Sequence, residues 1–318
     1  MMRRELAVLV ISVALGGGLL VAAPAVAVPP FPQAAVPPFP QAAGSCTPWA
    51  VSEVTSGVGV LENLAFDGMG TMLVARTDLV GGGALDGVSP DGTVTPIVPE
   101  VVAPGGIAVD GDDVYFATGN SFTAGIMGTD NGTVEVVSLG TGDARTVAEG
   151  LVMPNGLVRL TNGDILTSRN LGSGAGITRL PAAEPHTPEV VRTDLGTVDG
   201  LAVHDGNVYT VTTFDATTTL HILREDDLGG TVVSIELPGF GPLNAADDLT
   251  VGPDGIVYVA YNGAGKVVRV DPTTGESCDI AWGLPLVSSV RFGAGPGWNP
   301  DALYATSFTG TIYQLERS

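Results

Sequence analysis

The sequence predicts an all-β protein, a six-bladed β-propeller whose ring is closed by an N-terminal strand that completes the last blade. Two observations predict this fold. Short apolar segments alternate with glycine-containing turns, with 45 glycines in 318 residues, and no long stretch has helical periodicity. A pattern of two apolar strands around a turn also recurs six times at spacings of 41 to 50 residues. That is the repeat length of a propeller blade.

Residues 1–27 have the features of a secretory signal peptide. Arg3 and Arg4 form a positive start, an apolar stretch follows from Leu6, and Ala25-Val26-Ala27 offers a small-x-small cleavage site. A retained membrane anchor is the alternative, because the apolar stretch is of borderline spanning length. Its triple glycine and its cleavage site favour export. We therefore expect a secreted or extracellular protein, or one of the cell-envelope space, with no membrane contact after cleavage.

A proline-rich linker is expected next, over residues 28–45. The eight-residue unit in "VPPFPQAAVPPFPQAA" occurs twice across Val28–Ala43. Prolines at this density give a stiff, extended segment that buries little surface. We place the propeller at residues 46–318, long enough for one large domain with a full core.

The charge of the chain limits its partners. The formal net charge is −21, and removal of residues 1–27, with two arginines and one glutamate, changes it to −22. Such a surface repels nucleic acid and anionic membranes. Solubility alone explains most of this charge in an exported protein. We expect a monomer that binds a small-molecule substrate and no nucleic acid.

Two cysteines, Cys46 and Cys278, remain in the exported chain. In an oxidising compartment they favour one disulfide that ties the start of the domain to a late segment. Two unpaired thiols are the alternative.

The six repeats define the blades and the closure of the ring. Their first apolar residues are Leu64, Ile107, Leu157, Leu201, Leu249 and Val290. The last repeat supplies strands near 289–292, 302–306 and 311–315 and lacks an outer strand. The segment "WAVSEVT", from Trp49, precedes the first repeat, and we expect it to complete the last blade and remove an exposed edge. A parallel β-helix is the main alternative, but its repeats are shorter and more regular.

A column of polar residues lies two positions before these apolar residues. Its members are Glu62, Gly105, Asn155, Asp199, Asp247 and Ser288. The next position holds Asn63, Gly106, Gly156, Gly200, Asp248 and Ser289. The innermost strand of every blade lines the central channel, so equivalent positions form a ring at one mouth. Turn preferences explain single Asn-Gly and Asp-Gly pairs, but they do not explain Glu62.

The column predicts a metal site. Glu62, Asp199 and Asp247 would lie around one narrow axis, where at least one carboxylate must take up a proton unless a cation is present. Carboxylate and amide oxygens point to a hard divalent cation, Ca²⁺ before Mg²⁺, Mn²⁺ or Zn²⁺. We predict that Glu62, Asn155, Asp199 and Asp247 bind this ion. Asp248 is either a further ligand or the acid/base beside it.

At this point the sequence resembles a known superfamily. The column, the number of repeats and the stretches "DDLTVGPDGIVYVAYNGAGKVVRVDPTTGE" and "DALYATS" are similar to the gluconolactonase, regucalcin (senescence marker) and paraoxonase-like six-bladed propellers. The resemblance spans Trp49 to Leu315 and is weaker in the first two repeats. It implies that one calcium or similar ion is held by the Glu, Asn and Asp positions that fall on Glu62, Asn155, Asp199 and Asp247.

This chain departs from the superfamily pattern at two places. Asp199 stands where the fourth blade of the family has Asn, which adds negative charge to the site. Gly105 and Gly106 offer no side chain in the second blade.

The resemblance implies a secreted metal-dependent hydrolase of lactones or related esters. The ion would polarise the scissile carbonyl. Asp247, Asp199 or Asp248 would deprotonate the attacking water, with Asp247 favoured as in the family. The alternative is a non-catalytic exported propeller, a binding or scaffold module with a structural ion. A sugar or quinone-type dehydrogenase is a third hypothesis, but the column holds no basic residue to lie beside such a cofactor.

Overall fold

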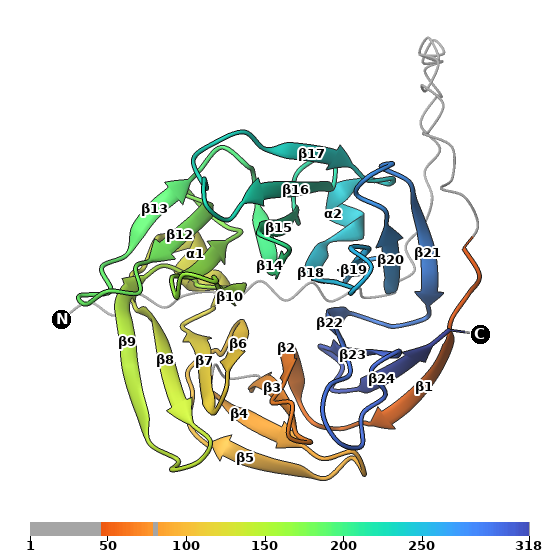
Figure 1. Ribbon diagram of the computed structural model, residues 1–318, viewed down its shortest axis with the longest axis horizontal. Helices are drawn as coiled ribbons and strands as arrows, with labels where there is room; N and C mark the ends of the chain where they lie inside the picture. Colours follow the sequence, from red (N-terminus) through yellow and green to blue (C-terminus); the bar gives the residue numbers. More distant parts are fainter. Residues whose placement is uncertain (1–45, 79–81, 318) are drawn as a thin grey trace, which may run out of the picture. The chain divides into compact units, whose positions relative to one another are not determined.

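The computed structural model describes residues 46–78 and 82–317. They form six four-stranded antiparallel sheets, which stand as blades around a common centre (Figure 1). The predicted six-bladed β-propeller is confirmed. The predicted signal peptide, residues 1–27, and the predicted linker, residues 28–45, lie outside the described residues.

The first five blades are meanders in which the innermost strand comes first in the chain, and the sixth begins with its innermost strand β22 but takes its outer strand from β1 (Figure 1). The first two blades hold β2 (Val60–Phe66), β3 (Met72–Thr77), β4 (Gly83–Val88), β5 (Val94–Val98), then β6 (Ile107–Asp110), β7 (Asp113–Thr118), β8 (Gly132–Ser138) and β9 (Ala144–Leu151). The next two hold β10 (Leu157–Arg159), β11 (Ile165–Arg169), β12 (Gly176–Leu180), β13 (Glu189–Arg192), then β14 (Val198–His204), β15 (Asn207–Thr212), β16 (Thr219–Arg224) and β17 (Val233–Glu236). The last two hold β18 (Ala246–Val251), β19 (Val257–Tyr261), β20 (Lys266–Val270), β21 (Ser277–Trp282), then β22 (Val287–Phe292), β23 (Leu303–Ser307), β24 (Ile312–Glu316) and β1 (Ala50–Thr55).

The ring closes as the sequence predicts. The sixth sheet has the strand order β1-β24-β23-β22, so its outer strand comes from the N-terminal side of the first blade. β1 pairs antiparallel with β24, with Val51 opposite Leu315 and Glu53 opposite Tyr313. This pairing covers the edge of β24 that would otherwise present unpaired backbone groups.

The core lies between neighbouring blades. All five residues of β19 are buried, whereas the outer strand β17 is largely exposed. A sheet that is covered on both faces needs apolar side chains at successive positions, which explains the continuous apolar runs of the inner strands. One cluster joins Tyr258 and Ala260 of the fifth blade to Val290 and Leu303 of the sixth. Packing between blades therefore stabilises the ring.

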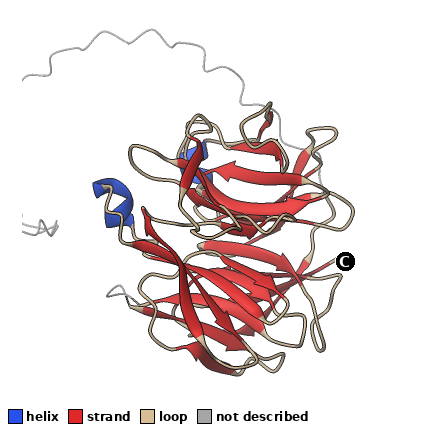
Figure 2. Cartoon of the chain, turned by 60° about the vertical axis from the view of Figure 1, so that its left-hand side comes forward, coloured by secondary structure: helices blue, strands red, loops and turns tan. Residues whose placement is uncertain are grey.

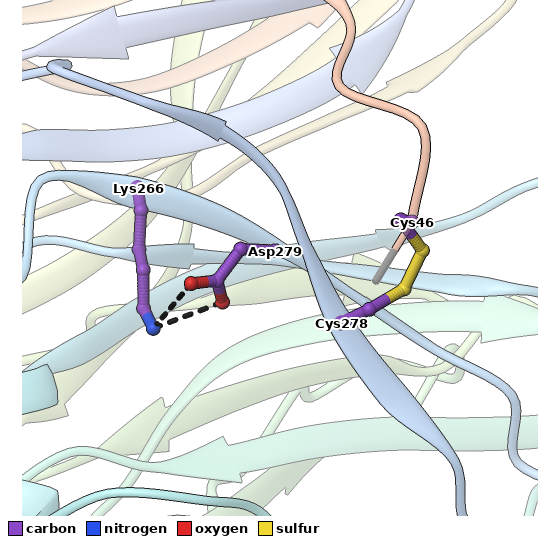
Figure 3. Close-up of a disulfide and its surroundings, with 4 residues drawn as sticks. All are labelled: Cys46, Lys266, Cys278 and Asp279. Carbon is purple, nitrogen blue, oxygen red and sulfur yellow. Dashed lines mark hydrogen bonds and ion pairs between the residues drawn. A yellow bond between two sulfur atoms is a disulfide. The ribbon is translucent and has the colours of Figure 1, made fainter. Parts of the chain in front are cut away.

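A disulfide joins the start of the described chain to the outer strand of the fifth blade. Cys46 bonds Cys278 in β21, with 5.7 Å between their Cα atoms, across 232 residues of sequence (Figure 3). The predicted pairing is confirmed. The next residue, Asp279, forms a half-exposed ion pair with Lys266 at 2.9 Å (Figure 3). The backbone N–H of Trp49 donates to the carbonyl of Ile280, which places β1 beside the same blade.

We expect removal of the disulfide to lower the free energy of unfolding by about 2–5 kcal/mol. The bond closes a long loop and so restricts the unfolded chain more than the folded one. The measurement is urea unfolding of the Cys46→Ser/Cys278→Ser variant. The control is Asp279→Asn, which breaks only the neighbouring surface pair and should change stability by less than about 1 kcal/mol. Equal effects of the two variants would contradict the prediction.

Among the described residues, two short helices interrupt the strands (Figure 2). α1 (Phe122–Met127) follows β7, and α2 (Gly241–Asn244) precedes β18. The Ser121 Oγ accepts a hydrogen bond from the Ala124 N–H at the start of α1, and Gly128 ends it in the left-handed conformation. Within residues 46–78 and 82–317, no helix is long and apolar enough to cross a membrane.

Candidate functional site

A pocket of about 290 Å³ lies where the innermost strands begin. The four predicted metal ligands, Glu62, Asn155, Asp199 and Asp247, all line it. They come from four blades and span nearly two hundred positions of sequence. The structure therefore brings these four residues together.

β-Bulges orient three of these side chains. The pairing of β2 with β3 skips Glu62, between Leu61 and Asn63. The pairing of β14 with β15 skips Asp199 and Gly200, and that of β18 with β19 skips Asp247 and Asp248. A bulge frees its residues from strict two-residue alternation and turns a side chain away from the sheet face. The same irregularity at the same place in three blades directs three carboxylates to one end of the channel.

Burial and mutual repulsion raise the pKa values of these carboxylates. Burial raises the pKa of Glu62 to about 7, with a further rise from the charge of Asp248 and a partial offset from Asn120. Asn120 Nδ2 donates to Glu62 Oε1 at 2.9 Å. Burial also raises the pKa of Asp199 well above its usual range, and the nearby Glu62 raises it further. Without a cation the site therefore favours neutral acids.

Asp199 and Asp247 differ in how firmly they are held. Asp199 Oδ2 accepts hydrogen bonds from Asn170 Nδ2 at 2.5 Å and from Thr213 Oγ1 at 2.9 Å. Asp247 Oδ2 accepts one from Asn262 Nδ2 at 3.2 Å. The pKa of Asp247 is also raised. Burial is the largest cause, and the charges of Asp199 and Glu62 add to it.

Three buried oxygens around the pocket have no hydrogen-bond partner. They are Asn120 Oδ1, Asn170 Oδ1 and Asp199 Oδ1. An unpartnered buried acceptor is costly, and each needs an explanation such as a ligand or an ion. In the described part of the chain, no group of three or more His, Cys, Asp and Glu side chains is placed so that it could hold a metal ion by itself. The oxygens here come partly from amides, and a mixed carboxylate and amide set suits a hard cation such as Ca²⁺.

Asp248 lies outside the pocket. Its Oδ2 is 2.7 Å from Nη1 of Arg291, and it accepts hydrogen bonds from Asn63 Nδ2 at 2.8 Å and Ser289 Oγ at 2.5 Å. Arg291 thus neutralises one of the two adjacent carboxylates within the protein. The sequence offered Asp248 as a ligand or an acid/base, but the structure places it in an ion pair beside the channel.

The glycines of the second column allow the inner strands to approach one another. A Cβ on Gly106 would lie 2.4 Å from the Leu157 nitrogen, and one on Gly200 would lie 2.5 Å from Asp248 Oδ1. Contacts this short leave no room for a side chain. These positions are therefore glycine for packing, and Asn120 supplies the second blade's polar contribution to the pocket.

Three amide residues of the site were not predicted. Asn120, Asn170 and Asn262 line the pocket and donate to Glu62, Asp199 and Asp247 respectively. A signal for them was present, since each lies two residues beyond the small residue that ends the repeat of its blade. They lie beyond the ends of the repeated segments.

The fold and the site define a six-bladed propeller with a carboxylate- and amide-lined pocket at the channel, and solved structures share this fold. A gluconolactonase from Xanthomonas campestris is 17% identical, covering 88% of this chain and 99% of its own, with a TM-score of 0.64. A luciferin-regenerating enzyme is 14% identical, covering 85% of this chain and 95% of its own, with a TM-score of 0.63.

A chain from a nidogen/laminin complex is also similar, at 18% identity, with 69% of this chain and 79% of that chain covered and a TM-score of 0.55. No protein-family profile matches the sequence, and no curated protein sequence matches it. At these identities the likeness establishes the fold that the resemblance implied.

Proposed function

We propose that the protein is an exported, metal-dependent hydrolase of lactones or related esters. The observation that carries the proposal is the pocket in which three carboxylates from three blades lie beside buried oxygens without partners. The features of residues 1–27 support export, and a disulfide suits an oxidising compartment. The similar gluconolactonase structure supports the choice of lactones.

Glu62, Asn155, Asp199 and Asp247 would hold the cation, for which we propose Ca²⁺. When bound, such a cation polarises the substrate carbonyl and stabilises the negative charge that develops on its oxygen. Asn170 and Thr213 fix the orientation of the Asp199 carboxylate through their hydrogen bonds. Asn262 and Asn120 do the same for Asp247 and Glu62.

Asp247 acts as the base. Its single long hydrogen bond leaves it freer than Asp199, which accepts two shorter ones. The Asp247 carboxylate takes a proton from water while the water oxygen bonds to the carbonyl carbon. The ring C–O bond then breaks, and the proton passes to the leaving alkoxide. Lactone and water thus give one hydroxy acid.

Metal analysis and a lactone panel test this proposal. The purified protein should contain about one equivalent of Ca²⁺ per chain and hydrolyse at least one lactone, and a chelator should abolish turnover until Ca²⁺ is restored. Bound metal with no turnover of any lactone or ester would instead support a non-catalytic module with a structural ion. Turnover that survives complete removal of metal would overturn the proposed role of the cation.

We expect the stability of the metal-free protein to rise as the pH falls from 8 to 5. The pKa of Glu62 is raised to about 7, and those of Asp199 and Asp247 are raised too. Over this window the folded state binds more protons than the unfolded chain, so acidification favours folding. Ca²⁺ must displace these protons and should raise the melting temperature more at pH 8 than at pH 5. Thermal scans with chelator and with Ca²⁺ measure both effects, and a metal-free protein that is more stable at pH 8 would contradict the prediction.

A further inference from the structure

The pocket has an apolar wall besides its oxygen cluster. The wall consists of Phe122, Met153, Leu171, Phe214 and Phe308, and we call these five residues the apolar wall. They come from the connections that follow the second strands of the blades and from the segment before β10. None of the described lining residues is Lys, Arg or His.

Exposure separates the two parts of the pocket. Asp199 and Asp247 are 2% and 8% exposed, whereas Phe122 and Phe214 are 61% and 40% exposed. The reacting groups therefore lie deep and the aromatic rings lie toward solvent. When the carbonyl of a substrate lies at the carboxylates, the rest of the substrate extends toward solvent beside these rings.

Contacts of α1 with neighbouring segments hold Phe122 in its exposed position. Arg169 donates from Nη2 to the Gly125 carbonyl at 2.9 Å and from Nε to the Leu171 carbonyl at 2.7 Å, so it ties α1 to the third blade. A Cβ on Gly125 would lie 2.3 Å from the Met153 sulfur. α1 therefore packs directly on the apolar wall. A six-residue helix is marginal by itself, so these contacts hold it.

The chemistry of the wall limits the substrate. A polyhydroxylated lactone would place hydroxyl groups against phenyl rings, where they lose hydrogen bonds to water and gain none. An anionic substrate would meet three carboxylates and no cationic side chain among the described lining residues. An alkyl or aryl substituent would instead remove apolar surface from water on both sides.

We propose, building on the hydrolase function above, that the preferred substrates are uncharged lactones that carry an apolar substituent. The substituent lies along the apolar wall, with Phe122 of α1 and Phe214 at its outer end, and the lactone carbonyl lies at the carboxylates. The apolar wall then determines which lactones are preferred, whereas all lactones contact the same carboxylates.

Steady-state kinetics on γ-lactones with alkyl chains from methyl to octyl, beside glucono-1,5-lactone, test this proposal. We expect kcat/KM to rise about threefold per added methylene until the wall is covered. Phe122→Ser should lower kcat/KM for the octyl lactone about five- to tenfold, with a smaller loss for the methyl lactone. The matched control is Met127→Ser on the same helix, where an apolar side chain that is also exposed does not line the pocket.

Calorimetric binding of the same lactones to Asp247→Asn separates this inference from the function on which it rests. Affinity that increases with chain length and falls in Asp247→Asn/Phe122→Ser supports the apolar wall, even if the wild type hydrolyses nothing and the proposed hydrolase function fails. Turnover with a flat chain-length profile, or with glucono-1,5-lactone preferred, overturns the inference and leaves the hydrolase function standing. If the protein neither hydrolyses nor binds any lactone, both the inference and the hydrolase function are overturned.

Discussion

Replacing Asp247 with Asn should lower kcat/KM for a lactone substrate by about 10²–10⁴-fold. The variant loses the base that accepts the proton of water, and it loses one charged oxygen ligand. The same change removes an acid that is costly to ionise, because burial first and then the charges of Asp199 and Glu62 raise the pKa of Asp247. The metal-free variant should therefore melt at a higher temperature than the wild type at pH 8, while the rise in melting temperature on adding Ca²⁺ disappears.

Asp301→Asn is the control for this variant. Asp301 is an exposed residue in the turn between β22 and β23, and its replacement removes the same charge outside the pocket. It should leave turnover and the response to Ca²⁺ unchanged. If Asp247→Asn kept its turnover and its response to Ca²⁺, neither the base nor the ligand role of Asp247 could be maintained.

Replacing Arg291 with Met should lower the free energy of unfolding by about 3–5 kcal/mol. Arg291 Nη1 lies 2.7 Å from Asp248 Oδ2 and also donates to the Leu249 carbonyl at 2.8 Å. Without the guanidinium, the buried Asp248 carboxylate loses its positively charged partner and retains the hydrogen bonds from Asn63 and Ser289. Urea unfolding at pH 8 measures the effect.

A double-mutant cycle shows whether the loss comes from the unpaired charge. Arg291→Met/Asp248→Asn should recover most of the stability, because a neutral amide can remain bonded to its neighbours. Binding of Ca²⁺ should persist in both variants, since neither residue lines the pocket. A double variant no more stable than Arg291→Met would show that Arg291 acts through packing and not through charge.

The architecture was predictable because it depends on a repeated local pattern. Apolar residues such as Leu64 and Leu249 recur at blade spacing and are fully buried in the innermost strands. The segment from Trp49 was placed by the same logic, since the last repeat needed an outer strand. α1 was not predicted, because six residues that include a glycine have no helical periodicity to detect, and contacts with other blades hold the helix in place.

The site was predictable only in part. Glu62 stood out because a glutamate is a poor turn former at a turn-like position. The different surroundings of Asp247 and Asp248 were not predictable, since they depend on a bulge in β18 and on Arg291, forty-three residues beyond Asp248. The amides Asn120, Asn170 and Asn262 fall outside the compared repeats, and their role follows from three-dimensional hydrogen bonding.

The bond between Cys46 and Cys278 also determines how the molecule responds to mechanical load. A pull on the chain ahead of Cys46 reaches β21 through a covalent link before it can strain the backbone hydrogen bonds between β1 and β24. The disulfide therefore protects the β1–β24 pairing, which closes the ring, when the N-terminal side of the chain is under tension. A reducing agent would break the disulfide, and the β1–β24 pair would then bear the force.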